Sequence, residues 1–217
     1  MLRKLTAEAL GSALLAGVVV GSGIMASQLT EDVAVALIAN TLATAAILFV
    51  IIATLGPISG AHFNPAVTLA FAIRGEIGWP LAAAYMAIQT VGCVLGVWLA
   101  HAMFEAPILQ IGQTVREGPG QALSEAVATF ALLFAIFGGL RYRPDWVPGL
   151  VAAVIAAGYW WTSSTSFANP AITVARALSD SFAGIRPQDA VIFVSAQFAS
   201  ALVSVVVLGW LFSDEDP

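Results

Sequence analysis

The sequence predicts an all-α membrane protein in which six transmembrane helices and two re-entrant half-helices form an inverted repeat of three spans plus three. Three observations lead to this fold class. Hydrophobic residues make up 59% of the 217 residues and charged residues only 10%, whereas soluble domains carry about 25% charged residues. Six apolar segments have roughly the length of about 20 residues that crosses a bilayer. Two shorter apolar segments each follow an Asn-Pro-Ala triplet.

The six spans are predicted from the apolar runs and from the signals at their ends. We expect them at residues 5–26, 33–55, 79–104, 120–140, 146–164 and 189–212. The first run could alternatively be a signal peptide, but it is long for one and further spans follow, so we interpret it as a transmembrane helix. The fifth run is the shortest, and it begins with an interfacial Trp146 and a proline, Pro148, in its first turn.

The two half-helices are expected at residues 65–74 and 170–179, which are too short to cross a bilayer. A polar or Gly- and Pro-rich stretch precedes each of them, at residues 56–60 and 162–166. We expect this backbone to be non-helical at membrane depth, where exposed carbonyl groups are tolerated only if they line a cavity. The short helices are therefore predicted to enter the membrane and stop inside it.

Matched landmarks predict that residues 1–217 form one transmembrane channel domain built from two related halves. The first repeat covers about 1–104, a polar linker about 105–119, and the second repeat about 120–212. The landmarks, in chain order, are Glu8 with Glu125, Asn64 with Asn169, and Gln89 with Gln197. Because three spans per half is an odd number, the second half must be inserted upside down, as in many transport proteins.

The two Asn-Pro-Ala triplets are strong helix starts with a direct consequence for transport. They are Asn64-Pro65-Ala66 and Asn169-Pro170-Ala171. Asparagine is a favoured cap residue, and proline fits the first helical position because its missing N–H would be unpaired there. Each start carries about half a positive charge from the helix dipole. Two starts that meet near the midplane would repel cations while their Asn amides donate hydrogen bonds into a lumen.

Residues 58–68 and 166–171 closely resemble the two loop motifs of the aquaporin family, also called the major intrinsic proteins, and the similarity extends over essentially the whole chain. The resemblance implies an aquaporin-like fold and a homotetramer in the lipid bilayer with one pore per subunit. It also implies a passive channel for water and small uncharged solutes. A secondary active transporter built on an inverted repeat is the alternative, for which only Glu8 and Glu125 could serve a coupling ion.

The resemblance further implies four residues that line the narrowest point of the pore. Gap-free counting from the two triplets assigns them to Thr44, Ala157, Ser166 and Ile172. Most family members carry Arg directly after the second triplet, where this chain has Ile172, and the family's aromatic and His filter residues are absent from these positions. We expect a wide, nearly neutral constriction. Such filters resemble a bacterial branch associated with arsenic resistance, which implies glycerol-like solutes or arsenite as substrates.

The remaining ionisable residues of the spans and loops have more than one interpretation. Glu8 and Glu125 could relay protons, but we favour carboxylates that accept hydrogen bonds from the re-entrant loop of their own half. His62 is expected to brace its loop or line the inner pore. Arg176 could hang over the outer vestibule and replace the missing filter charge; the favoured alternative is that it pairs with Asp180 or extends to the interface.

Composition and loop charge exclude several other classes and indicate an orientation. The net charge of −5 offers no basic surface for nucleic acid, and we find no catalytic residue set, no metal-ligand cluster and no cofactor motif. The protein is therefore not expected to be an enzyme. On the side of the termini lie Arg3, Lys4, Arg74, Arg141 and Arg143, and on the other side lie Arg116, Arg176 and Arg186. This excess predicts a multi-pass protein of the cell inner membrane with both termini in the cytoplasm.

Overall fold

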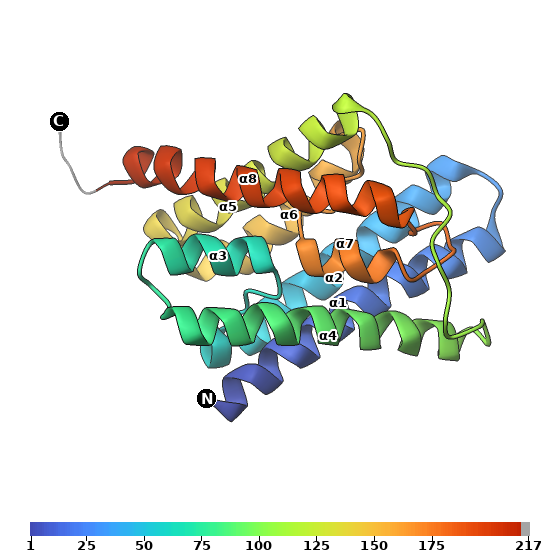
Figure 1. Cartoon of the computed structure of the whole chain (residues 1–217), viewed down its shortest axis with the longest axis horizontal. Coiled ribbons are helices and arrows are strands. Elements are labelled where there is room, and N and C mark those ends of the chain that lie inside the picture. Colours follow the sequence, from blue (N-terminus) through green and yellow to red (C-terminus); the bar gives the residue numbers. More distant parts are fainter. Residues whose placement is uncertain (214–217) are drawn as a thin grey trace.

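The computed structural model describes residues 1–213, whose regular structure is entirely helical (Figure 1). In chain order the elements are α1 (Leu2–Leu29), α2 (Val33–Ser59), α3 (Pro65–Ile73), α4 (Trp79–Met103), α5 (Pro119–Tyr142), the 3-10 turn η1 (Pro144–Trp146), α6 (Val147–Trp161), α7 (Pro170–Arg176) and α8 (Pro187–Leu211). The predicted all-α membrane fold is confirmed, and α3 and α7 are its two half-helices. Residues 214–217 of the predicted domain lie outside the described part.

The fifth predicted span is shorter than expected. The helices α1, α2, α4, α5 and α8 are long and apolar enough to cross a membrane. By contrast, α6 has 15 residues, a rise of about 22 Å, against a hydrocarbon core of about 30 Å. The predicted span 146–164 loses its end to the hydroxyl-rich stretch that begins at Thr162, because Ser and Thr side chains compete for backbone hydrogen bonds.

The first non-helical stretch was predicted at residues 56–60, and the structure corrects this. The helix α2 continues through Pro57 to Ser59 and ends at Gly60, whose φ of 92° is left-handed. The N–H of Gly60 still bonds the carbonyl of Gly56, at 2.9 Å. Glycine adopts this conformation without a Cβ penalty, so it serves as a helix C-cap. Proline interrupts a helix only locally, so the non-helical segment is confined to residues 60–64.

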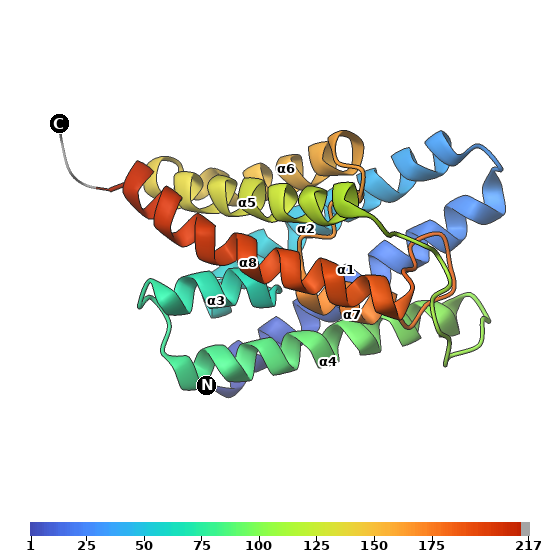
Figure 2. The same ribbon diagram turned by 45° about the horizontal axis from the view of Figure 1, so that its top comes forward.

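The helices form two similar groups that interlock. Within the groups, α1 packs on α2 and α4, while α5 packs on α6 and α8, and α2 and α6 join the groups. Each half-helix also contacts the other group, α3 on α8 and α7 on α4. In Figures 1 and 2, α3 and α7 lie end to end in the middle of the molecule with their starts facing each other. The interlock therefore places both half-helix starts at mid-depth.

Small residues allow the closest helix contact, between α1 and α4. A Cβ atom added to Gly96 would lie 2.1 Å from the carbonyl oxygen of Ala13, a distance that no side chain tolerates. A Cβ atom added to Gly17 would lie 3.2 Å from the carbonyl oxygen of Gly96, which is also too close for an ordinary contact. Without a hydrophobic driving force in lipid, helices associate through such close backbone packing.

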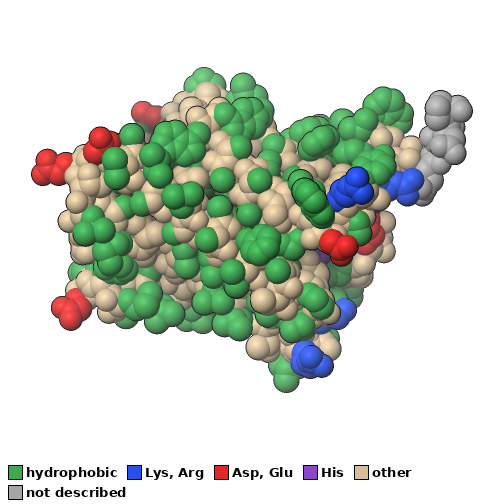
Figure 3. Space-filling view, turned by 180° about the vertical axis from the view of Figure 1, so that it is seen from behind, with side chains coloured by type: hydrophobic (Ala, Val, Ile, Leu, Met, Phe, Trp, Pro, Cys, Tyr) green, Lys and Arg blue, Asp and Glu red, His purple; other side chains and the backbone are tan. Residues whose placement is uncertain are grey.

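The outer surface is that of a multi-pass membrane protein. Large hydrophobic side chains such as Leu42, Leu99 and Val206 are more than half exposed along the long helices. In Figure 3, hydrophobic side chains cover the middle of the molecule, the visible basic side chains lie at one end, and the opposite end shows acidic ones. Exposed apolar surface of this extent requires a lipid environment.

Candidate pore and its constriction

Each half-helix is started by the Asn of its triplet. The Oδ1 atom of Asn64 accepts a hydrogen bond from the N–H of Ala66 at 2.9 Å. Asn169 does the same for Ala171 at 3.0 Å and for Ile172 at 3.3 Å. Both Asn residues have extended backbone, and a proline follows each at the first helical position. Local sequence thus determines where α3 and α7 begin.

The two starts are tied to each other by a reciprocal pair of hydrogen bonds. Asn64 donates from Nδ2 to the carbonyl of Ala168 at 2.7 Å, and Asn169 donates from Nδ2 to the carbonyl of Phe63 at 2.8 Å. Each amide nitrogen carries two hydrogens, and within residues 1–213 the second has no protein acceptor. Because both Asn residues line one central cavity, these free N–H groups are available to a solute.

The loop before each triplet has the same strained conformation. In the first loop Ala61 and Phe63 are left-handed, with φ of 52° and 48°, and in the second loop Ser166 and Ala168 have φ of 52° and 47°. Non-glycine residues in this region cost roughly 1–3 kcal/mol each and persist only where their surroundings hold them. The repeated geometry identifies these loops as a functional region that needs external support.

Two buried carboxylates supply that support. Glu8 accepts hydrogen bonds from the backbone N–H groups of His62 at 3.1 Å and Phe63 at 2.8 Å. Glu125 accepts them from Phe167 at 2.9 Å and Ala168 at 2.8 Å. Both carboxylates are fully buried. A buried charge is tolerated only with such partners, so each Glu both requires and orients its loop.

In each half, one glutamine links the buried carboxylate to the half-helix. Gln89 donates from Nε2 to Glu8 at 2.7 Å and to Thr68 on α3 at 2.9 Å. Gln197 makes the equivalent bonds to Glu125 at 2.6 Å and to Thr173 on α7 at 2.9 Å. The matched Glu and Gln residues therefore form two copies of one network, which links a span, a loop and a half-helix.

His62 lies in the first loop, where it also lines the cavity. Its Nδ1 atom is 3.1 Å from the hydroxyl of Thr68. The ring contacts Phe71, with 4.7 Å between centroids, and meets Tyr85 edge-on at 5.5 Å. The side chain is thus held against the first half-helix rather than free in the lumen.

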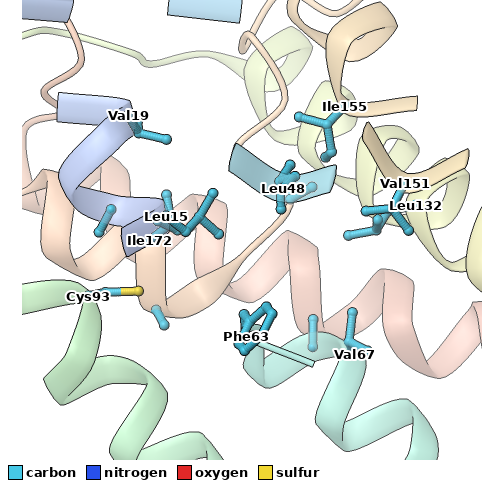
Figure 4. Close-up of a cluster of buried hydrophobic side chains, with 14 of the residues drawn as sticks. Leu15, Val19, Leu48, Phe63, Val67, Cys93, Leu132, Val151, Ile155 and Ile172 are labelled. Atoms are coloured by element: carbon cyan, nitrogen blue, oxygen red, sulfur yellow. The ribbon is translucent and has the colours of Figure 1, made fainter. Parts of the chain in front are cut away.

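The cavity is lined by both apolar and polar groups. Figure 4 shows apolar side chains that converge from several helices, and nine of the ten labelled residues line the cavity. They are Leu15, Val19, Leu48, Phe63, Val67, Leu132, Val151, Ile155 and Ile172. The loop segments Gly60–Asn64, which include Phe63, and Ser166–Asn169 also line it. A solute in this cavity would meet both aliphatic and polar groups.

The structure places three of the four predicted constriction residues in the cavity wall. Thr44, Ser166 and Ile172 line the cavity, and each is at least 95% buried. Ala157 does not line it and is exposed on the outside of α6. The assignment of Ala157 is therefore corrected.

The correction follows from the rotation of α6 about its axis. Positions four apart share a helix face, and the residues of α6 that line the cavity are Val147, Val151, Ile155 and Tyr159. Ala157 lies halfway between two of them and so points away. A Cβ atom added to Gly158 would lie 2.5 Å from the hydroxyl of Ser166, so the helix packs directly on the loop. Tyr159, which counting from the triplet missed, was recoverable from the four-residue stripe.

Arg176 also differs from its favoured interpretation. It is 97% buried, it lines the cavity, and within residues 1–213 it forms no ion pair with Asp180. Its Nε–H donates to the carbonyl of Ala183. Its guanidinium carbon lies 3.3 Å from the centroid of the Phe167 ring. The expectation of pairing with Asp180 or extending to the interface is therefore wrong, and Arg176 lies beside the pore.

A second arginine, Arg116 of the linker, reaches the same loop. It donates from Nε to the carbonyl of Gly184 at 3.0 Å and from Nη1 to the carbonyl of Ser164 at 3.4 Å. Its guanidinium carbon lies 5.0 Å from the centroid of Phe167. Burial lowers the pKa of Arg116, and the negative charge of Glu125 opposes that shift. The sequence offered no local signal for this contact, because linker and loop are far apart in the chain.

Comparisons with known proteins agree with this geometry. A family model described as major intrinsic protein matches residues 1–157. The aquaglyceroporin AqpS of Rhizobium meliloti (strain 1021) is 50% identical over 215 residues, covering 99% of this chain and 92% of that protein. Aquaporin NIP2-1 of Oryza sativa subsp. japonica is 33% identical over 137 residues, covering 62% of this chain and 45% of that protein.

The fold has a counterpart among solved structures. The X-ray structure of the aquaglyceroporin from Plasmodium falciparum superposes with a TM-score of 0.69 at 17% identity, covering 97% of this chain and 98% of that one. At this identity the likeness concerns the fold alone. Together with the family match and the AqpS similarity, it agrees with two half-helices that meet tip to tip around a central cavity. The chain therefore belongs to the major intrinsic protein family, and it is a membrane channel rather than an enzyme.

Proposed function

We propose that this channel conducts water and small uncharged solutes that carry hydroxyl groups, including glycerol-like solutes and undissociated arsenite. The observation that carries the proposal is the mixed lining of the cavity, in which aliphatic side chains occur together with the Asn amides and the re-entrant loops. The carbon atoms of a polyol suit the aliphatic side chains, and its hydroxyls suit the polar groups. The similarity to a protein named an aquaglyceroporin supports the same solute class.

The cavity disfavours ions for reasons of charge and solvation. Of the described residues that line it, none is Asp or Glu, so a cation would find no counter-charge. The starts of α3 and α7 add partial positive charge at Asn64 and Asn169. An ion that leaves water for such a site loses many kcal/mol of solvation energy. Neutral solutes avoid this cost because their lost hydrogen bonds are replaced by the polar groups of the lining.

The width of the lumen is proposed to depend on Ile172. Its side chain lines the cavity at the position that directly follows the second triplet, where it adds bulk but no charge or hydrogen-bond donor. Thr44 and Ser166 add small hydroxyl groups to the lining of the cavity. Together the three side chains leave the lumen open to solutes larger than water at this depth.

Stopped-flow light scattering on proteoliposomes tests the proposal with Ile172→Arg and the control Ile172→Val. Wild-type protein should conduct water, glycerol and arsenite down their gradients. The arginine variant should lose glycerol and arsenite flux by about 10-fold or more relative to water, since a barrier increase of about 1.4 kcal/mol suffices. The valine variant should behave as wild type. Wild-type water flux without any solute flux would contradict the proposed solute class.

We further propose a homotetramer in the cell inner membrane with both termini in the cytoplasm. The five basic residues on the side of the termini, against three on the other side, support the orientation. The basic side chains that are visible in Figure 3 lie at one end of the molecule. The single Cys93 is buried, so cysteines introduced by Lys4→Cys and Glu105→Cys can be probed separately. In intact cells a membrane-impermeant maleimide should label only the second. Native mass spectrometry should show four subunits, and a stable monomer would contradict the tetramer.

A further inference from the structure

The two halves of the channel differ in the packing of their first and third spans. In the first half, Gly92 and Gly96 bring α4 against the backbone of α1, and a Cβ atom added to Gly92 would lie 2.5 Å from the carbonyl oxygen of Ala9. The second half has Ser200 and Ser204 at the matching places on α8. Because these side chains need space, α8 cannot approach α5 as closely as α4 approaches α1.

Two side chains act as spacers between α5 and α8. Ser200 donates from Oγ to the carbonyl of Ala126 at 2.6 Å, so a hydroxyl group stands where the first half has a direct backbone contact. Phe130 takes the place that Ala13 has in the first half. The hydroxyl of Ser204 is buried and has no hydrogen-bond partner within residues 1–213, so it does not draw the two helices together.

An apolar groove opens on the outside of this seam, with a volume of about 340 Å³. Figures 1 and 2 show α5 and α8 side by side. The groove is open to the lipid-facing surface, because Val203 at its edge is 55% exposed and Leu123, one turn before it on α5, is 66% exposed. None of the described residues that line this α5–α8 groove is charged: Ala126, Val127 and Phe130 on α5, and Ala199, Ser200 and Val203 on α8.

We propose that the α5–α8 groove binds one acyl chain of a membrane phospholipid, which completes the packing between the two helices. The groove is continuous with the lipid-facing surface, so a chain can enter it from the bilayer. An empty groove would leave its lining without dispersion contacts, and the spacer side chains prevent the helices from closing it. A methylene chain is narrow and flexible, and it brings no polar group that the apolar lining would leave unpaired.

A helix from a second copy of the chain fits this groove less well. An α-helix with its side chains is about 10–12 Å across. Helices approach closely in membranes where small residues recur at four-residue spacing. Here Ala126 is followed at that spacing by Phe130, and Ala199 by Val203. The lining therefore lacks the small-residue stripe that a second helix would need, and it favours a lipid chain.

The groove lies at the same level of α5 and α8 as the brace of the second re-entrant loop. Ala126 directly follows Glu125, and Ser200 lies three residues after Gln197. Glu125 and Gln197 are joined across the seam by a hydrogen bond of 2.6 Å. A chain in the groove therefore stabilises the two helices that hold this brace.

The central test is photo-cross-linking from the lipid. Wild-type protein is placed in vesicles of palmitoyl-oleoyl phosphatidylcholine that contain a small share of the same lipid with a diazirine in the middle of one acyl chain. Mass spectrometry then maps the labelled residues. Phe130 and Val203 should be labelled about 10-fold more than Val91, the factor that a preference of about 1.4 kcal/mol gives. Val91 is the counterpart of Ala199 on α4 and is 52% exposed.

Two variants remove the groove in different ways. Ala199→Trp fills it with an indole ring, and the matched control Val91→Trp adds the same ring to the open face of α4. The double variant Ser200→Gly with Ser204→Gly restores the residues of the first half, so the helices can close. Both groove variants should lose the preferential labelling of Phe130, and the control should keep it. Added phosphatidylcholine should raise the unfolding temperature of wild type in detergent but not that of Ala199→Trp.

Three results would overturn the inference, and none of them depends on which solute the channel conducts. Equal labelling of Phe130 and Val91 in wild type would show ordinary contact with bulk lipid only. Preferential labelling of Phe130 that persists in both groove variants would place the lipid elsewhere. A benzophenone maleimide coupled to Val203→Cys should attach to phospholipid, since Cys93 is buried; attachment to a second copy of the chain would assign the groove to a subunit contact.

Discussion

Replacing Glu125 with leucine removes the group that holds the second re-entrant loop. The carboxylate accepts hydrogen bonds from the N–H groups of Phe167 and Ala168 and from the amide of Gln197, at 2.9, 2.8 and 2.6 Å. Leucine has a similar size but accepts none of them. In Glu125→Leu these three donors are left without this acceptor in a fully buried site, where water is not available as a substitute.

The expected magnitude follows from these contacts. Hydrogen bonds to a charged group contribute about 1.5–3 kcal/mol each, so three lost bonds weaken the loop by roughly 5–9 kcal/mol. The loop also holds Thr165, Ser166 and Ala168 in left-handed conformations, each unfavourable by about 1–3 kcal/mol. Once the brace is gone, relaxation of the loop is favourable. Relaxation moves Asn169 and withdraws the carbonyl of Ala168 that Asn64 needs.

The assay is water permeability per channel by stopped-flow light scattering, together with thermal unfolding in detergent. Glu125→Leu should lose nearly all water flux and unfold at a clearly lower temperature. Glu125→Gln should be intermediate, since its amide oxygen still accepts a bond while its NH2 group faces backbone donors. Glu31→Leu, at an exposed position, is the control. A Glu125→Leu channel with wild-type permeability and stability would refute the bracing role of this carboxylate.

Two other predictions concern packing and capping. Gly96→Ala should prevent stable folding, because its Cβ would lie 2.1 Å from the carbonyl oxygen of Ala13. The control Gly209→Ala, whose Cβ would have nothing within 4 Å, should be neutral or stabilise the protein by about 1 kcal/mol. Equal melting temperatures for the two variants would contradict the close α1–α4 contact. Asn169→Ala loses a helix cap and the hydrogen bond to Phe63, and we expect destabilisation of about 2 kcal/mol by thermal unfolding. An unchanged melting temperature would show that another group caps α7.

The sequence by itself determined the class of fold and the location of the central barrier. Long apolar runs predict spans because a bilayer core has a fixed thickness. Asn64-Pro65 and Asn169-Pro170 start half-helices because capping and the proline ring act within a few residues. Glu8 and Glu125 were expected to brace the loops because a buried carboxylate needs donors, and the loop amides are the natural ones. All these effects are local or repeated in both halves, so they can be read along the chain.

Only the tertiary structure decided which side chains of α6 and α7 line the cavity. Counting from the triplet selected Ala157, but the contact of Gly158 with Ser166 sets the rotation of α6 and turns Tyr159 toward the cavity. The place of Arg176 depends on Phe167, on Ala183 and on a short half-helix that ends inside the protein. Helix rotation and long-range contacts of this kind result from the packing of segments far apart in the chain, and no local pattern encodes them. The lining of the cavity is therefore a property of the assembled bundle, whereas the two Asn-Pro-Ala starts are a property of the sequence.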